Sequence, residues 1–189
     1  MPELRLSLPG IALSRADGVD LVSPGNYHFG NHYLAPINSN NHRNTSLTMA
    51  LKLSPEDHEF RVLFESCQFP PAEFHHRAHL RLAYVYLADN DTESAYQLMR
   101  DALQRFLTHH GIDLSKYHDT MTRAWILAVR HFMAATPDAA SADDFIAQHP
   151  EMLDANIMMT HYSAELLFSD EARAKFVEPD LDPIPRYNR

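Results

Sequence analysis

The sequence is poor in cysteine, glycine and basic side chains. Its 189 residues include one cysteine, Cys67, so the chain forms no internal disulfide and we expect a reducing, cytoplasmic setting. Glycine occurs only 5 times and alternating strand patterns are few, which favours helices. There are 16 Lys and Arg against 25 Asp and Glu, a net charge of −9. This balance argues against a nucleic-acid partner, because phosphate neutralisation needs clustered basic side chains.

Long apolar runs are also missing. The longest fall far below the ~18 residues that a membrane span requires. The N-terminus has no basic region followed by an apolar stretch, so we expect no secretory signal and no membrane partner. Hydrophobic residues still make up 45% of the chain, which is enough for a globular core. The sequence leaves the oligomeric state open.

Two segments of different character divide the chain. Residues 1–48 are rich in Asn, Ser, Gly and Pro and show no helical period, which predicts an irregular or disordered arm. Helical patterning begins at Met49, so residues 49–189 are predicted to form the helical domain. Met49 is then an alternative natural start, and the intact mass of the native protein tests this. The proline-rich end, VEPDLDPIPRYNR, is predicted to be an extended tail.

Capping and breaking residues delimit the expected helices. Ser54-Pro55 is a favoured helix start, Pro70-Pro71 a break, and Gly111 a left-handed stop. The pattern predicts helices at about 54–67, 72–88, 92–110, 116–135 and 142–148, a further one after Pro150, and short pieces capped by Ser163 and Ser169. We therefore expect an all-α, single-domain bundle of five to seven helices, with an irregular N-terminal arm and an extended C-terminal tail.

A histidine cluster, FHHRAH at 74–79, opens the second expected helix. His76 and His79 share one stripe of that helix, which continues into its apolar face. His75 is also one turn before His79, so geometry alone does not exclude it. On the fourth expected helix, His118 begins a second stripe with Thr122 and Trp125. The spacing predicts that His76, His79 and His118 meet at one end of the bundle.

Three converging imidazoles are typical of a catalytic metal site. They supply three nitrogen ligands and leave positions open for water or substrate. Zn, Fe or Mn could occupy such a site, with Tyr117 and Thr122 orienting ligands or a small-molecule substrate. Glu165, in a break between helices, is a further candidate, because its carboxylate would convert the set into one suited to iron or manganese. The leading hypothesis is a metal-dependent enzyme that acts by hydrolysis or oxygen-dependent chemistry.

Other interpretations of the same histidines stay open. They could act in acid–base catalysis without metal, since imidazole titrates near neutral pH. They could also be structural, in a non-catalytic helical module that binds a protein or peptide. The position of the rings separates these cases. Ring nitrogens that converge on a pocket favour the enzyme, whereas rings satisfied by backbone carbonyls favour the module.

The two motifs together resemble an uncharacterised family of small bacterial helical proteins. Its members show F-x-H-x-x-H-L followed by Y-H-x-T-x-T and an aromatic residue. The matching residues here are Phe74, His76, His79 and Leu80, then Tyr117, His118, Thr120, Thr122 and Trp125. The resemblance spans about residues 56 to 185 and implies that His76, rather than His75, partners His79. It brings no established activity.

Overall fold

The structure, a computed structural model, describes residues 53–187. Its α-helices are α1 (Pro55–Glu65), α2 (His76–Asp89), α3 (Thr92–His109), α4 (Asp119–Ala135), α5 (Ala142–Gln148), α6 (Ala164–Leu167) and α7 (Asp170–Ala174). Its 3-10 turns are η1 (Pro71–Glu73), η2 (Leu114–Lys116), η3 (Pro150–Leu153) and η4 (Ala155–Thr160). No strand occurs among these residues, so the all-α prediction is confirmed for the described part of the chain. The predicted arm, residues 1–48, lies outside it, as does Met49.

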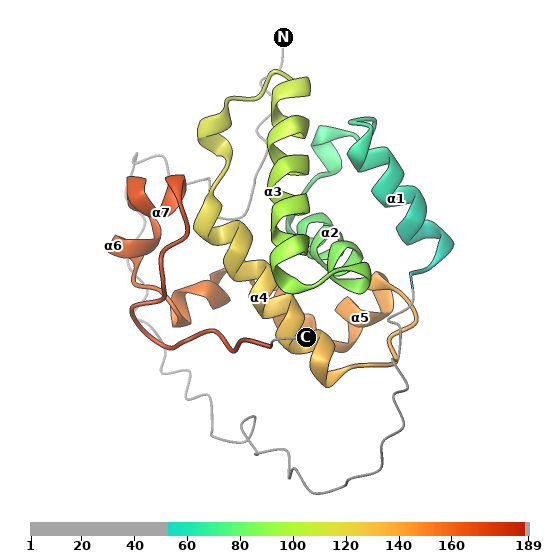
Figure 1. Cartoon of the computed structure of the whole chain (residues 1–189). Coiled ribbons are helices and arrows are strands. Elements are labelled where there is room, and N and C mark those ends of the chain that lie inside the picture. The colour runs from blue at the N-terminus through green and yellow to red at the C-terminus, as the bar shows by residue number, and fades with distance from the viewer. Residues whose placement is uncertain (1–52, 188–189) are drawn as a thin grey trace, which may run out of the picture. The chain divides into compact units, whose positions relative to one another are not determined.

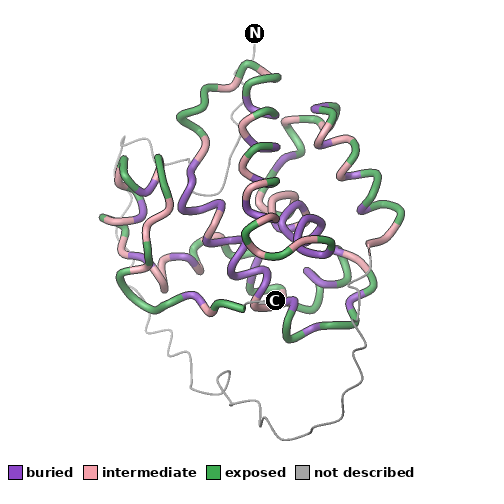
Figure 2. The backbone as a smooth tube through the Cα atoms, in the orientation of Figure 1, coloured by how far each residue is buried: buried purple, intermediate pink, exposed green. Residues whose placement is uncertain are grey.

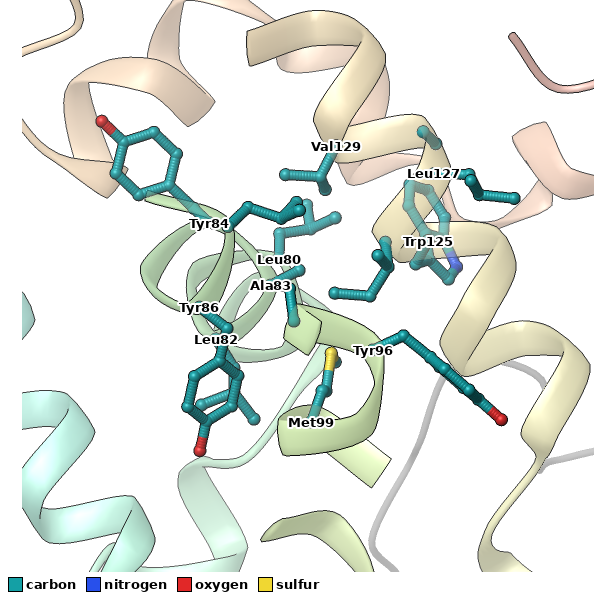
Figure 3. Close-up of a cluster of buried hydrophobic side chains, with 14 of the residues drawn as sticks. Leu80, Leu82, Ala83, Tyr84, Tyr86, Tyr96, Met99, Trp125, Leu127 and Val129 are labelled. Atoms are coloured by element: carbon teal, nitrogen blue, oxygen red, sulfur yellow. The ribbon is translucent and has the colours of Figure 1, made fainter. Parts of the chain in front are cut away.

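Two helices form the centre of the helical domain. Helix α2 packs against α1, α3, α4 and α5 (Figure 1). Its residues 82–88 are all buried. Helix α4 is buried along most of its length, whereas α1 and the C-terminal tail expose one side (Figure 2). Apolar residues on all sides of α2 explain this position, because such a helix is stable only when it is surrounded. Figure 3 shows side chains of α2, α3 and α4 meeting in the core.

Serine side chains cap four of the seven α-helices in the described residues. Ser54 and Asp57 form a capping box at α1, each side chain bonding the other's backbone N–H. Three further serines accept from a backbone N–H at the start of a helix: Ser141 at α5, Ser163 at α6 and Ser169 at α7. Gly111 has φ +65° and follows the end of α3, as predicted for a left-handed stop.

Some predicted boundaries are wrong at the helix starts. Helix α2 begins at His76 rather than near Ala72, because His75 is extended and the preceding residues form the separate turn η1. Helix α3, by contrast, begins at Thr92 as predicted, with Asp91 as its N-cap. Helix α4 begins after His118, and the residues near Lys116 form η2. The stretch after Pro150 makes two 3-10 turns instead of a helix.

The C-terminal tail from Lys175 is without regular structure, as predicted, and is bonded to the bundle. The Thr120 hydroxyl of α4 donates to the Lys175 carbonyl at 2.9 Å and accepts from the Val177 N–H at 3.0 Å. Further along, the Leu181 N–H donates to the His161 carbonyl. Every helix in the described part of the chain is too short or too polar to cross a lipid bilayer.

Candidate functional site

The N-terminal part of α4, the start of α2 and one face of α3 enclose a cavity of about 50 Å³, named here the motif pocket. Its apolar wall consists of Phe74, Met99, Leu103, Phe106, Leu107, Met121 and the ring of Trp125. Its polar lining consists of His79, Lys116, Tyr117, His118 and Thr122. Six of these twelve residues belong to the two sequence motifs, so the motifs converge on one site. The pocket carries one charged side chain, Lys116, and no acidic one.

Helix α3 contributes the part of the wall that carries no motif. Met99, Leu103 and Phe106 lie on its apolar face at helical spacing. Figure 3 shows Met99 near the side chains of α2, with Trp125 of α4 in the same cluster. The sequence offered no signal that this face lines a pocket, because an apolar stripe on a helix is ordinary core.

His118 is held at both ring nitrogens. Its Nδ1 accepts from the Met121 N–H at 3.3 Å, which makes His118 the N-cap of α4. Its Nε2 is 2.8 Å from the carbonyl of Leu167 in α6, and a carbonyl only accepts, so Nε2 carries the proton. Burial lowers the pKa of His118, which favours this neutral form. Neither nitrogen retains a free lone pair for a metal ion.

His79 also bonds to a backbone carbonyl, but keeps one nitrogen available. Its Nδ1 donates to the His75 carbonyl at 3.0 Å, and its ring packs on Phe74 with 4.0 Å between the ring centroids. The second nitrogen, Nε2, therefore carries a lone pair and forms no hydrogen bond with a described residue. Burial, aided by the nearby His76 and His75, lowers the pKa of His79 to about 4. His79 is thus a neutral acceptor in the motif pocket.

His76 lies outside the lining of the motif pocket. Its Nε2 donates to the Met152 carbonyl in η3 at 2.8 Å, and its ring meets the Trp125 ring edge-on at 4.7 Å. Burial lowers its pKa. Its Nδ1 is buried and, among the described residues, has no hydrogen-bond partner, and the same holds for the indole N–H of Trp125. One acceptor and one donor are therefore left unpaired around this contact.

Tyr117 and Thr122 line the pocket, but each already donates its hydroxyl proton to a hydrogen bond within the protein. Tyr117 donates to the Asp119 carboxylate at 2.7 Å, and Tyr96 donates to the same carboxylate at 2.7 and 2.8 Å. Burial, with the Asp119 hydrogen bond and charge, raises the pKa of Tyr117 well above its usual range. Thr122 donates to the His118 carbonyl at 2.9 Å. Asp119, which fixes Tyr117, was not among the predicted site residues.

The predicted six residues are thus brought together only in part. His79, His118, Tyr117 and Thr122 share the motif pocket, whereas His76 packs beside it and Glu165 is exposed on α6. No three His, Cys, Asp or Glu side chains within residues 53–187 are placed to hold a metal ion. All three predicted histidine ligands donate to backbone carbonyls, which is the arrangement expected of structural histidines.

Comparison with family models, with curated proteins and with solved structures found no match for this chain.

The neutral state of His79 predicts a pH-dependent stability. In the unfolded chain an imidazole has a pKa near 6.5, so it binds a proton below that pH. In the folded protein His79 stays unprotonated down to about pH 4, so between these two values only the unfolded state binds this proton. The free energy of unfolding is therefore expected to fall as the pH drops from about 7 to about 4.5. Urea denaturation at a series of pH values measures this. The fall should be smaller in His79→Phe.

His58→Phe is the matched control, because His58 is exposed on α1 and the substitution also removes one histidine. Its effect on the pH dependence should be smaller than that of His79→Phe. An equal pH dependence in His79→Phe and in the unchanged protein would show that folding does not lower the pKa of His79.

Proposed function

We propose that this protein binds a small, largely apolar molecule in the motif pocket, and that its motif histidines build and line that pocket. The observation that carries the proposal concerns Trp125, a residue that lines the motif pocket and whose indole N–H is buried without a partner in the described chain. A buried donor without an acceptor costs roughly 1–3 kcal/mol, so its presence calls for a partner. A bound molecule with a hydrogen-bond acceptor supplies one.

The polar groups of the pocket favour binding over acid–base catalysis. A histidine with a pKa of about 4 is a weak base at neutral pH, and the raised pKa of Tyr117 makes it a weak acid. Both groups stay neutral and keep fixed hydrogen-bonding roles, which suits recognition. A cavity of about 50 Å³ holds on the order of four water-sized groups, so the occupant is small, and a peptide segment would not fit.

The metal-dependent enzyme stays a prediction that a metal analysis tests. In the described geometry, His118 would have to release two hydrogen bonds and His76 one before the three rings could share an ion. Glu165 would have to leave the surface of α6 to join them. These requirements place the metal hypothesis second to ligand binding.

Butyramide is a suitable first probe, because it has a short apolar tail and a neutral carbonyl acceptor. Trp125 is the only tryptophan, so a proton–nitrogen correlation spectrum shows one indole resonance, which reports directly on the pocket. We expect butyramide to move this resonance downfield in a saturable way, with a dissociation constant on the order of 1 mM for a ligand of this size. A downfield shift is the sign of a new hydrogen bond to the indole N–H.

Two substitutions on α3 make the test specific. Leu107→Phe enlarges a side chain that lines the pocket and should weaken butyramide binding by at least about fivefold. Leu98→Phe makes the same change on the exposed side of the helix and should leave binding unchanged. If Leu107→Phe does not fold, Leu103→Phe takes its place in the test, because it also enlarges a side chain that lines the pocket. An indole resonance that does not shift when butyramide is added would contradict the proposal. This result is expected if the indole N–H of Trp125 forms a hydrogen bond with His76 instead.

A further inference from the structure

Lys116 is the one charged residue that lines the motif pocket, and its charge partner, Asp113, whose pKa it helps to lower, is not part of the pocket lining. It is exposed on η2, between the end of α3 and the start of α4. It forms no ion pair with any residue that the structure describes. The other lysine of the described chain, Lys175, is paired with Glu171 at 3.0 Å. Lys116 is therefore an exposed cation at the solvent side of a pocket whose other lining residues are apolar or neutral.

No negative charge in the pocket lining opposes that of Lys116. Asp and Glu are absent from the lining, His79 is neutral, and Tyr117 keeps its proton. The carboxylate of Asp119 lies beside Tyr117 but accepts hydrogen bonds from two tyrosine hydroxyls. An amine ligand would therefore find no acidic side chain in the pocket lining, whereas an acidic ligand would find the ammonium group of Lys116 as its counter-charge.

The unpaired hydrogen-bonding groups point to the same ligand class. The indole N–H of Trp125 and the ammonium of Lys116 are both donors, and an ionised carboxylate is acceptor-only with room for several donors. Charge-assisted hydrogen bonds to a carboxylate are stronger than neutral ones. The apolar wall of Phe74, Leu103, Phe106 and Leu107 provides for an aliphatic or aromatic tail.

From these observations, and resting on the proposed function above, we infer that the ligand of the motif pocket is a small carboxylate with an apolar tail. The tail lies against the side chains of α3, the carboxylate accepts from the indole N–H of Trp125, and Lys116 balances its charge. The net charge of −9 repels anions at long range, but salt screens this repulsion beyond about 8–10 Å. Local pairing with Lys116 therefore decides the affinity.

The test compares three probes of one shape on the full chain: butyrate, butyramide and butylammonium. The readout is the Trp125 indole resonance at about 50 mM salt, where charge pairing is only partly screened. We expect butyrate to bind about fivefold more tightly than butyramide, and butylammonium more weakly than either. Raising the salt to about 0.5 M should weaken butyrate binding and leave butyramide binding unchanged.

Lys116→Gln should make butyrate and butyramide bind equally. Lys175→Gln, which removes the same charge from a lysine already paired with Glu171, should keep the preference for butyrate. If butyramide binds as well as butyrate in the unchanged protein, or if Lys116→Gln keeps the preference, the carboxylate inference fails while the binding function stands. If none of the three probes moves the indole resonance, the binding function fails as well.

Discussion

Replacing Asp57 with alanine is expected to lower the free energy of unfolding by about 3–5 kcal/mol, because it breaks a buried ion pair. Asp57 is fully buried in α1. Its carboxylate accepts from the Arg81 guanidinium of α2 at 2.9 Å and from the Ala142 N–H at the start of α5 at 2.9 Å. Alanine leaves both donors unpaired, and it removes the carboxylate through which α1 is bonded to α2 and to the start of α5. Urea denaturation measures the loss.

Asp143→Ala provides the matched control. Asp143 pairs with Arg77 at 2.9 Å, but both side chains are at least half exposed. An exposed pair of this kind contributes less than about 1 kcal/mol, since water screens it. A loss in Asp57→Ala as small as that in Asp143→Ala would mean that the helices hold together without the buried carboxylate.

The connection through Asp57 also bears on the candidate site. Helix α5 continues into η3, whose Met152 carbonyl accepts from His76. His76 in turn contacts the Trp125 ring at the motif pocket. The buried ion pair thus supports, through α5 and η3, one of the rings that surround the unpaired indole N–H.

Helix existence was predictable from local signals, whereas helix starts depended on tertiary packing. Ser141 and Gly111 mark the ends of elements through backbone bonds that involve only near neighbours. The start of α2 differs from its prediction because Phe74 is drawn into the core, with its ring 4.6 Å from Phe64 and 5.4 Å from Phe106. This packing keeps residues 74 and 75 out of the helix, and helical spacing could not reveal it.

The candidate site, like the helices, could be predicted from the sequence only in part. His79 and His118 line one pocket, but His118 precedes α4 as its extended N-cap, so helical period does not account for its position. The hydrogen-bonding roles of the rings could not be predicted. The carbonyl that holds His76 is 76 residues away along the chain, and the one that holds His118 is 49 residues away. Whether an imidazole is a ligand or a structural donor depends on such distant partners.

Replacing His118 with alanine is expected to destabilise the protein by about 3 kcal/mol, because it removes two buried hydrogen bonds at once. The N-cap bond to the Met121 N–H accounts for about 1 kcal/mol. The bond from Nε2 to the Leu167 carbonyl accounts for most of the rest, since the carbonyl then lacks a partner. His118→Asn keeps a capping side chain but removes the imidazole N–H, so it should recover about a third of the loss.

Metal content measured on the same proteins separates the structural role of His118 from a ligand role. If His118 caps α4 and holds α6, the unchanged protein, purified without added metal, should contain far less than one Zn, Fe or Mn ion per chain. His118→Ala should then change stability and leave the metal content as it was. The opposite result would support the three-histidine metal site. The unchanged protein would then contain one metal ion per chain, and His118→Asn would lose this metal with little change in stability. His58→Ala controls for the loss of an exposed histidine and should alter neither quantity, because His58 lies on the outer side of α1.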